Sequence, residues 1–310
     1  MTKILVTGGA GFIGSAVSRR LLAEGNEVVV LDDLSTGDEG SVPQGAHLMV
    51  GDIRDIENCR KAVKGCEIVF HEAALPSVAR SITDPVTTHA VNATGTLNIL
   101  KAAADSGCRR LVYASSSSVY GEPPEVLRSE DQRPMPISPY AVSKLTGENY
   151  AASFTASLGL STVSLRYFNV FGPGQNAESK YAAVFPRFVS ALLRGDRPEI
   201  YGDGEQTRDF TFIDDVVSAN LLAAVAGPEA DGEAFNVGGG EAKSVNELLR
   251  TLAAAADMPA EASFAPPRPG DVRHSLADLG KSRELLGYEP QAKWEESVAA
   301  TVDWFKSNPA

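Results

Sequence analysis

The sequence predicts an α/β fold, with a doubly wound, mostly parallel Rossmann sheet and a smaller C-terminal α/β domain. Short segments rich in Val, Ile and Leu alternate with helical segments along the first half of the chain. This alternation is typical of repeated βαβ units. After about residue 170, loops rich in Gly, Pro and polar residues interrupt shorter helices, a pattern that favours a smaller domain shaping a pocket.

The predicted strands lack strict two-residue alternation, which is typical of strands covered on both faces. They are residues 3–7, 27–31, 46–50, 67–71, 110–115 and 161–166, and helices are expected over 14–24, 56–64, 89–106 and 140–157. We expect residues 1–170 to form the first domain, with a return segment near 210–237. Residues 171–310 are expected to supply most of the second domain.

Composition excludes several classes of protein. The chain has 310 residues, of which 43% are hydrophobic and 22% charged, and its formal net charge is −12. Binding to nucleic acid or to an anionic membrane needs a basic surface, so neither partner is expected. Cys59, Cys66 and Cys108 form no CxxC pair, so we predict neither a disulfide framework nor a metal site. With no export signal and no membrane-length apolar run at the start, a cytoplasmic location is expected.

The first chemical motif is TGGAGFIG at residues 7–14, between the first strand and the first helix. Gly9 or Gly8, with Gly11 and Gly14, fits the glycine pattern that lets a backbone approach a pyrophosphate at a helix N-terminus. Asp32 ends the second strand 18 residues after Gly14. A carboxylate there binds the ribose hydroxyls and repels a 2′-phosphate, which predicts NAD over NADP.

Two further acidic residues lie near this region. Asp33 is the first alternative to Asp32 for the ribose contact. Asp52, in the segment GDI at 51–53, follows the third strand. Its spacing fits a contact with the adenine about as well as it fits a plain helix cap.

The second motif is SPYAVSKLTGE at residues 138–148. Tyr140 and Lys144 are four residues apart and therefore lie on one face of a helix. A phenol has a pKa near ~10, but a nearby ammonium and an oxidised nicotinamide would both stabilise the phenolate. Tyr140 is thus a candidate base. Upstream, YASSSSVYG at 113–121 places four hydroxyls at the end of a predicted buried strand.

Taken together, several motifs resemble the extended short-chain dehydrogenase/reductases, specifically the NAD-dependent nucleotide-sugar epimerase/dehydratase group. They are TGGAGFIG, LDDLSTG, HEAALPSVARSITDP, VNATGTLNIL, SSSSVYG, YAVSK, RYFNVFGPGQ, GDGEQTRDFTFIDD and RPGDVRHSLAD. They cover nearly the whole chain in the family's order. Within the group, the sequence is most similar to the UDP-glucose and UDP-N-acetylglucosamine 4-epimerases.

The resemblance implies that the first domain binds NAD and that the second binds a UDP-sugar. The implied cofactor-binding residues are Gly8, Gly11, Phe12, Ile13, Gly14, Asp32, Asp33, Ser35, Thr36, Gly37, Asp52, Ile53, Ala73, Ala74, Asn92, Tyr140, Lys144 and Tyr167. Asn92 is equally well explained as a buried amide that supports a helix. Pro76 stands where many galactose epimerases carry a lysine that contacts the cofactor, which puts that one contact in doubt.

The resemblance also explains the serines. Ser116 matches the catalytic Ser/Thr that hydrogen-bonds the sugar O4 and works with Tyr140 and Lys144. Ser117 and Ser118 stand where the related 4,6-dehydratases carry an Asp–Glu pair. Without those carboxyl groups there is no evident acid and base to eliminate water across C5 and C6, so the reaction is expected to stop at oxidation and reduction of C4.

For the substrate, the resemblance implies contacts from the serine segment, Tyr140 and the second domain. The residues are Ser116, Ser117, Ser118, Tyr140, Asn169, Val184, Tyr201, Arg208, Arg268, Asp271 and Ser275. Arginines suit bidentate phosphate contacts. Ser275 replaces the bulky tyrosine of glucose-restricted members, and its small side chain is expected to admit an N-acetyl group at C2.

The sequence leaves two alternative functions open, and it predicts an assembly state. Arg187, in AAVFPRF, lies near the carboxylate-binding arginine of UDP-glucuronate 4-epimerases, so a uronate enzyme is the alternative. A non-catalytic NAD-sensing protein is a remote alternative, because such proteins typically lose the Tyr–Lys pair. A homodimer is expected through helices 89–106 and 140–157, using Ala90, Leu97, Leu100, Ala141, Leu145 and Ala152, although the same residues would also suit the internal sheet.

Overall fold

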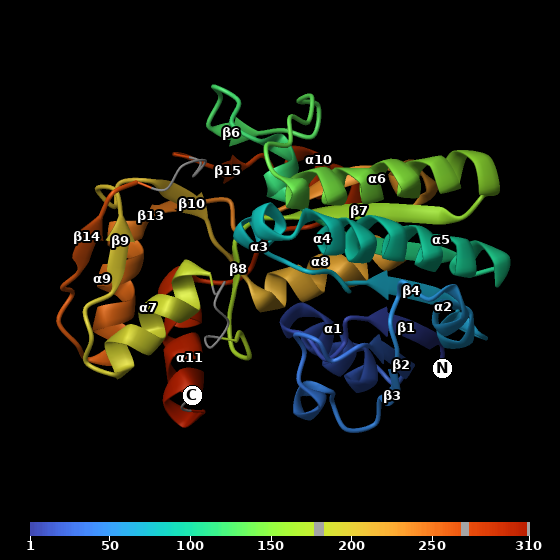
Figure 1. Cartoon of the computed structure of the whole chain (residues 1–310), viewed down its shortest axis with the longest axis horizontal. Helices are drawn as coiled ribbons and strands as arrows, with labels where there is room; N and C mark the ends of the chain where they lie inside the picture. Colours follow the sequence, from blue (N-terminus) through green and yellow to red (C-terminus); the bar gives the residue numbers. More distant parts are fainter. Residues whose placement is uncertain (177–182, 268–272, 309–310) are drawn as a thin grey trace.

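A seven-stranded parallel sheet forms the larger part of the molecule in the computed structural model, which describes residues 1–176, 183–267 and 273–308. The strands are β1 (Lys3–Thr7), β2 (Glu27–Asp32), β3 (His47–Val50), β4 (Ile68–His71), β5 (Arg110–Ser116), β7 (Ser161–Tyr167) and β12 (Ala234–Val237). Their order is β12-β7-β5-β4-β1-β2-β3, and every neighbouring pair is parallel. The predicted doubly wound sheet is therefore confirmed (Figure 1). Strand β12 adds a strand from beyond residue 230 by pairing with β7.

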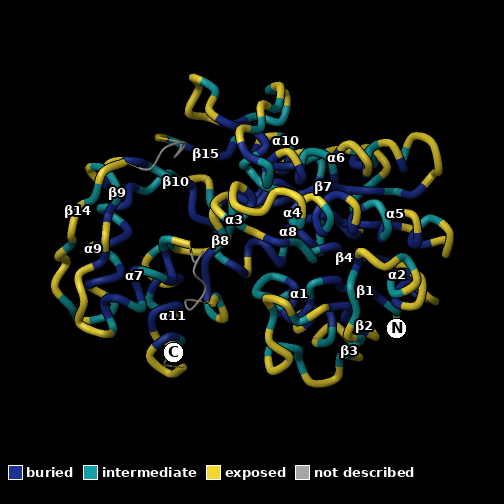
Figure 2. Tube along the Cα trace, in the orientation of Figure 1, coloured by how far each residue is buried: buried dark blue, intermediate teal, exposed yellow. Residues whose placement is uncertain are grey.

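Helices cover both faces of this sheet. Alternate residues of β1 point to opposite sides: Ile4 and Val6 belong to one apolar core, and Leu5 belongs to the other. The first core is closed by α1 (Phe12–Ala23) and α8 (Ile213–Val225), and the second by α2 (Ile56–Val63), α5 (Thr96–Asp105) and α6 (Pro139–Leu158). Apart from the edge strand β3, which has no buried residue, the strands are mostly dark blue in Figure 2 because side chains on both faces are buried.

The helix predicted over 89–106 is not one regular α-helix. It consists of α4 (Pro85–His89), a π-helical segment (Ala90–Gly95) and α5, and α3 (Val78–Thr83) precedes it. Within the π-helical segment, the Asn92 side chain leaves the helix to bind the main chain of Leu75. Such wide turns occur mostly at functional sites, and this one lies beside the cavity described below.

The C-terminal part packs around an aromatic core of its own. Helices α7 (Val184–Leu193), α9 (Val245–Ala256) and α11 (Trp294–Ser307) surround Phe171, Phe185, Phe188 and Phe210. This assembly lies to the left of the large sheet in Figure 1. Four two-stranded sheets pair β9 (Glu199–Tyr201) with β14 (Ser263–Ala265), β10 (Thr207–Asp209) with β13 (Ala242–Ser244), β8 (Val170–Phe171) with β11 (Thr211–Phe212), and β6 (Leu127–Arg128) with β15 (Leu276–Ala277). Helix α10 (Gly280–Leu286) packs against α8 and β12.

Two of the residues predicted to form a second, intersubunit face belong instead to the core of their own chain. Leu100 and Ala141 are 0% and 1% exposed. Leu97 and Leu145 are partly buried against the same internal cores. The side chains exposed along α4 and α6 are different ones, Val86 and Val142 among them. The assignment of Leu100 and Ala141 to an outward face was wrong because both sides of these helices are apolar, and the sequence does not show which side meets the sheet. Among the described residues, no helix is long and apolar enough to cross a membrane.

Candidate active site

The site is built at the carboxyl ends of the parallel strands, where open α/β sheets bind their ligands. Gly8 follows β1, Asp32 ends β2, Ala73 follows β4, Ser116 ends β5 and Tyr167 ends β7. Residues from four of these five strand ends line one cavity of about 840 Å³, and Ser116 lies just outside it. The cavity falls in the range usual for cofactor sites.

The glycine turn brings bare backbone to the cavity wall. Gly8 has a φ of +70°, and its carbonyl accepts a hydrogen bond from the Gly11 N–H at 3.0 Å. A Cβ on Gly14 would stand 2.2 Å from the Gly8 oxygen, so no side chain fits there. Helix α1 begins directly after this turn, at Phe12. Its unpaired N–H groups and positive dipole end suit a pyrophosphate.

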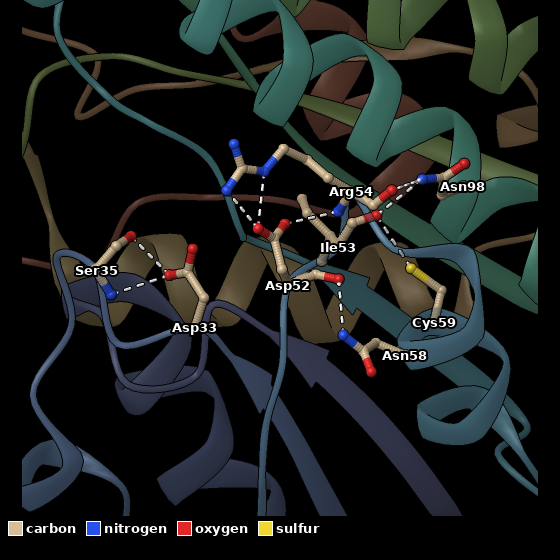
Figure 3. A network of polar contacts seen from close by, with 8 residues as sticks. All are labelled: Asp33, Ser35, Asp52, Ile53, Arg54, Asn58, Cys59 and Asn98. Carbon is tan, nitrogen blue, oxygen red and sulfur yellow. Dashed lines mark hydrogen bonds and ion pairs between the residues drawn. The ribbon is translucent and has the colours of Figure 1, made fainter.

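Acidic side chains lie at the opposite end of the cavity from the catalytic pair. Asp32 is 8% exposed, and its carboxylate accepts hydrogen bonds from the N–H groups of Ala10 (3.0 Å) and Leu34 (2.9 Å). It therefore also ties the glycine turn to β2. Asp33 is exposed and accepts from the Ser35 N–H and hydroxyl, as Figure 3 shows. Both carboxylates line the cavity, as a ribose-binding site requires.

Asp52 does not line the cavity, although its neighbours Gly51 and Ile53 do. Its carboxylate binds the Arg54 guanidinium, with the Arg54 Nε at 2.7 Å (Figure 3). That bond holds the pKa of Asp52 below its usual value. The alternative reading as a helix cap fails as well, because the side chain that caps α2 is that of Asp55.

Tyr140 and Lys144 face the cavity from the first turns of α6. The helix begins where Ser138 caps the Ala141 N–H and Pro139 occupies the first position, which fixes Tyr140 in the opening turn. Lys144 is 4% exposed, and its Nζ donates to the Ala114 carbonyl at 2.8 Å and lies 6.0 Å from the Tyr140 ring centre.

The pKa values at this pair follow from burial. Burial lowers the pKa of Lys144 to about 8, against the opposing effect of the carboxylates of Glu72 and Glu148. Burial also raises the pKa of Tyr140, and a hydrogen bond with Ser116 opposes that rise. In the protein alone, desolvation of the phenol outweighs the hydrogen bond with Ser116, and the lowering that we expected from Lys144 is not observed.

The serine run separates into different roles. Ser115 Oγ donates to the buried Glu148 carboxylate, while Ser116 Oγ accepts from the Ser118 N–H at 3.2 Å and contacts Tyr140. Ser117 and Ser118 lie in a 3-10 turn (Ser117–Tyr120), and the buried Ser118 hydroxyl has no hydrogen-bond partner in the structure. The structure thus places Ser116 in contact with Tyr140, and the roles predicted for these two residues require such a contact.

The remaining predicted cofactor residues divide into lining and supporting positions. Those lining the cavity are Gly8, Gly11, Phe12, Ile13, Gly14, Asp32, Asp33, Ser35, Thr36, Gly37, Ile53, Ala73, Ala74, Tyr140, Lys144 and Tyr167. Asn92 lies behind the wall, where its amide accepts from the Leu75 N–H (2.7 Å) and donates to the Leu75 carbonyl and to Ser143. It holds the loop after β4 against α6 and does not face the cavity.

Most predicted substrate residues lie outside this cavity. Asn169 donates to the Asp209 carbonyl, Val184 begins α7, and Arg208 donates to the Thr207 carbonyl from β10. The Arg187 guanidinium lies over the Tyr201 ring at 5.7 Å. Ser275 is 8% exposed, and its main chain pairs with that of Thr207 and Asp209. Arg268 and Asp271 lie outside the described residues.

Sequence reasoning missed several residues that line the cavity, including Glu72, Ser77 and Arg80. All three belong to the segment after β4 that we used only as a family motif. Ser77 carries a φ of +112°, a strained value for a residue other than glycine. A polar or charged residue directly after a buried strand was the available signal, and Glu72 fits it.

The residues present therefore suit a dinucleotide. A glycine cradle that any Cβ would fill adjoins a helix N-terminus, carboxylates stand at one end, and a buried Tyr–Lys pair stands at the other. Residues 4–238 match the model of the NAD dependent epimerase/dehydratase family. The UDP-glucose 4-epimerase of Mycolicibacterium smegmatis is 41% identical over 312 residues, covering 98% of this chain and 99% of that protein.

Two solved structures of nucleotide-sugar epimerases are similar to this chain over nearly its whole length. The UDP-glucose 4-epimerase of Thermotoga maritima, crystallised with UDP-glucose, is 39% identical and has a TM-score of 0.96 over 100% of both chains. The UDP-N-acetylglucosamine 4-epimerase of Methanobrevibacter ruminantium, in complex with UDP-N-acetylmuramic acid, is 37% identical, with a TM-score of 0.94 over 99% of both chains. The chain belongs to the NAD-dependent epimerase/dehydratase family. The predictions of family and of NAD as cofactor are confirmed, and the relatives named here are isomerases, the class predicted for this enzyme.

Proposed function

We propose that this enzyme interconverts UDP-hexoses with their C4 epimers, acting on UDP-glucose and UDP-galactose and also on UDP-N-acetylglucosamine and UDP-N-acetylgalactosamine. One observation carries the proposal: Tyr140 contacts Ser116 and shares the cavity wall with Lys144, while residues 117 and 118 carry no carboxyl group. This set supports oxidation and reduction at C4, and it offers no acid and base for dehydration.

Each residue has a distinct task in this reaction. Tyr140 removes the proton of the 4-hydroxyl and later returns one, and Ser116 hydrogen-bonds O4 during the transfer. Lys144, anchored to the Ala114 carbonyl, supplies the positive charge that favours the phenolate. NAD, held by the glycine turn and the carboxylates of the cavity, would supply the hydride acceptor for C4 and the hydride donor for the 4-keto sugar. The remaining cavity wall orients the reactants and excludes water.

The test is a side-by-side turnover assay on UDP-glucose, UDP-N-acetylglucosamine and UDP-glucuronate with bound NAD and no added metal. Tyr140→Phe should lower turnover by a factor on the order of 10² or more, because it removes the base. Tyr150→Phe is the matched control, since that tyrosine lies on the same helix and is exposed. Near-normal activity of Tyr140→Phe would refute the assignment.

Substrate breadth is proposed from Ser275. A tyrosine at this position would close the pocket near C2 and exclude an N-acetyl group, whereas serine leaves space. Ser275→Tyr should therefore reduce turnover of the acetylated pair by at least ~10-fold while UDP-glucose changes little. Because Ser275 is buried, the melting temperature of the variant is measured alongside. Equal loss on both pairs would mean that the residue supports the fold.

A uronate substrate is the second candidate. Its carboxylate would need a cation, and Arg187 is the residue suggested by the sequence. Arg187 lines a smaller cavity of about 280 Å³, shared with Arg194 and Arg197, and it is absent from the wall of the large cavity. Turnover of UDP-glucuronate above that of UDP-glucose would favour this second candidate.

We also propose a cytosolic homodimer that uses the outward faces of α4 and α6. Val86 is 77% exposed and Val142 49%, and α4 packs beside α6. Exposed apolar side chains on adjoining helices are typical of protein interfaces. Light scattering at micromolar concentration should give a dimer, and Val142→Glu should give a monomer.

A further inference from the structure

Glu72 places a carboxylate in the wall of the large cavity, close to the catalytic pair. It is the first residue after β4, and its Oε1 accepts a hydrogen bond from the Tyr167 hydroxyl at 2.9 Å. The Tyr167 oxygen in turn accepts from the amide of Asn220, which is 0% exposed and lies on α8. The carboxylate is therefore oriented by a chain of contacts through the ends of β4 and β7 and a buried helix.

Charged and titratable side chains from three other elements line the cavity together with the Glu72 carboxylate. Lys144 and Tyr140 come from α6, Arg80 from α3 and Tyr167 from β7, and all of them line the same cavity. Two further titratable side chains, those of Glu148 and His71, bind partners of their own. Glu148 pairs with Arg166 at 2.9 Å, and the buried ring of His71 lies between the hydroxyls of Thr7 and Thr96, with its pKa lowered by burial to about 3.

Among the described residues that line the cavity, the acids are Asp32, Asp33 and Glu72. Asp32 binds the Ala10 N–H of the glycine turn and Asp33 binds Ser35, whereas Glu72 is the one of these three whose charge acts on Lys144. The Lys144 ammonium and this carboxylate interact, each favouring the charged form of the other. Burial is the stronger effect on Glu72 and raises its pKa to about 7.

We propose that Glu72 is a positioning residue whose negative charge offsets that of Lys144 and makes the protein bind oxidised NAD in preference to the reduced form. The proposal rests on the catalytic pair marking the nicotinamide end of the cofactor, as in the proposed function. The oxidised nicotinamide ring carries a positive charge, which the reduced ring lacks. A carboxylate held nearby stabilises the oxidised ring, and an ammonium nearby destabilises it.

This preference has a use in the reaction. An enzyme that must return the hydride before it releases the sugar benefits when the reduced cofactor is the less stable bound form. The 4-keto sugar is then reduced promptly, and its loss to solvent becomes rarer. Glu72 acts in this step through charge alone, since no bond to it forms or breaks.

The experiment measures binding to apo protein without any sugar. Dissociation constants for NAD⁺ and NADH are determined for the wild type, Glu72→Gln, Glu72→Asp and Glu67→Gln. The last variant is the matched control, because Glu67 lies just before the opposite end of β4 and its side chain is 57% exposed. Glu72→Gln should lower the ratio Kd(NADH)/Kd(NAD⁺) by about tenfold or more, as expected for loss of one nearby charge in a poorly solvated site. Glu67→Gln should leave it unchanged.

Two further measurements separate charge from structure. Glu72→Asp keeps the charge and should retain most of the preference, whereas Lys144→Met should raise the same ratio, the opposite sign. In the wild type, the ratio should rise between about pH 6 and pH 7.5 as Glu72 ionises, and this part of the rise should be absent in Glu72→Gln. At higher pH, Lys144, whose pKa is about 8, loses its charge in both proteins and raises the ratio as well.

The proposal is overturned if Glu72→Gln weakens both cofactor forms equally, or if it keeps the wild-type rise of the ratio between about pH 6 and pH 7.5. Either result would leave Glu72 with a structural role only. Failure of the proposed function is a separate outcome: an enzyme that turns over none of the UDP-sugars can still show the charge-dependent ratio. Likewise, an active 4-epimerase with no such ratio refutes only the role of Glu72.

Discussion

Gly14→Ala is the sharpest perturbation of the cofactor site, because the added atom would meet only backbone. The new Cβ would stand 2.2 Å from the Gly8 oxygen, 2.7 Å from the Gly8 carbonyl carbon and 2.9 Å from the Gly9 Cα. An ordinary contact is 3.4–4 Å, so the turn and the helix must separate by more than about 1 Å.

The glycine turn cannot move freely to make room for the added Cβ. The Gly8 N–H donates to the Leu31 carbonyl at 2.8 Å, and Gly8 lies so close to the main chain of Ala73 that it has no room on that side. Overpacking of this kind typically costs about 1–3 kcal/mol. If this cost falls on the geometry that receives the pyrophosphate, NAD binding weakens by about 5- to 150-fold.

The assay is the NAD content of the purified protein, followed by titration of apo protein with NAD. Gly40→Ala is the matched control, since its Cβ would meet nothing closer than 3.5 Å and its φ is not positive. The control should bind NAD as the wild type does. Wild-type affinity in Gly14→Ala, with an unchanged melting temperature, would show that the turn is softer than its contacts imply and would refute the reasoning.

Three other predictions follow from the same structure. Arg166 and Glu148 form an ion pair at 2.9 Å, with both side chains under 8% exposed, so Arg166→Met leaves the Glu148 carboxylate buried without its charged partner. This variant should lower the free energy of unfolding, measured in urea, by about 3–5 kcal/mol. Lys293→Met removes one partner of an exposed ion pair (74% and 72% exposed) and should change nothing measurable, and similar losses in the two variants would contradict this ranking. His71 has a folded pKa of about 3, below its unfolded value, so the unfolded state takes up its proton first as the pH falls. His71 should therefore contribute a drop of about 2 kcal/mol in the free energy of unfolding from pH 7 to pH 5, opposed by the raised pKa of Glu72. His71→Asn should remove this contribution from the wild-type pH dependence even though it lowers stability overall, whereas the same pH dependence in both proteins would locate the proton uptake elsewhere. Asp32→Asn removes the charge and keeps an acceptor oxygen for only one of the two N–H groups, those of Ala10 and Leu34, so it should weaken NAD retention and relax the discrimination against NADP by about tenfold or more, read by reconstitution of apo protein. If Asp33→Asn alone has this effect, the ribose contact belongs to Asp33.

Short-range features were predictable from the sequence by itself. The strand, glycine turn and helix at residues 3–23 follow from local propensity and from backbone contacts between neighbours, such as Gly14 against Gly8. Tyr140 and Lys144 share a face because four residues make about one helical turn. The order of strands and helices likewise identified a parallel sheet, since βαβ units pair in only a few ways.

Tertiary structure decided what depends on residues far apart in the chain. Asn92 faces Leu75 and Ser143 and not the cavity, and Asp52 is taken by Arg54. Two apolar sides on one helix do not reveal which of them meets the sheet, so Leu100 became core. Glu72 gained its place beside the catalytic pair only when β4 and β7 aligned their carboxyl ends and brought Tyr167 to its carboxylate, 95 positions away in the sequence. The spacing of residues along the chain does not predict the contact between Glu72 and Tyr167, because packing between strands fixes this contact and neighbouring residues in the sequence do not.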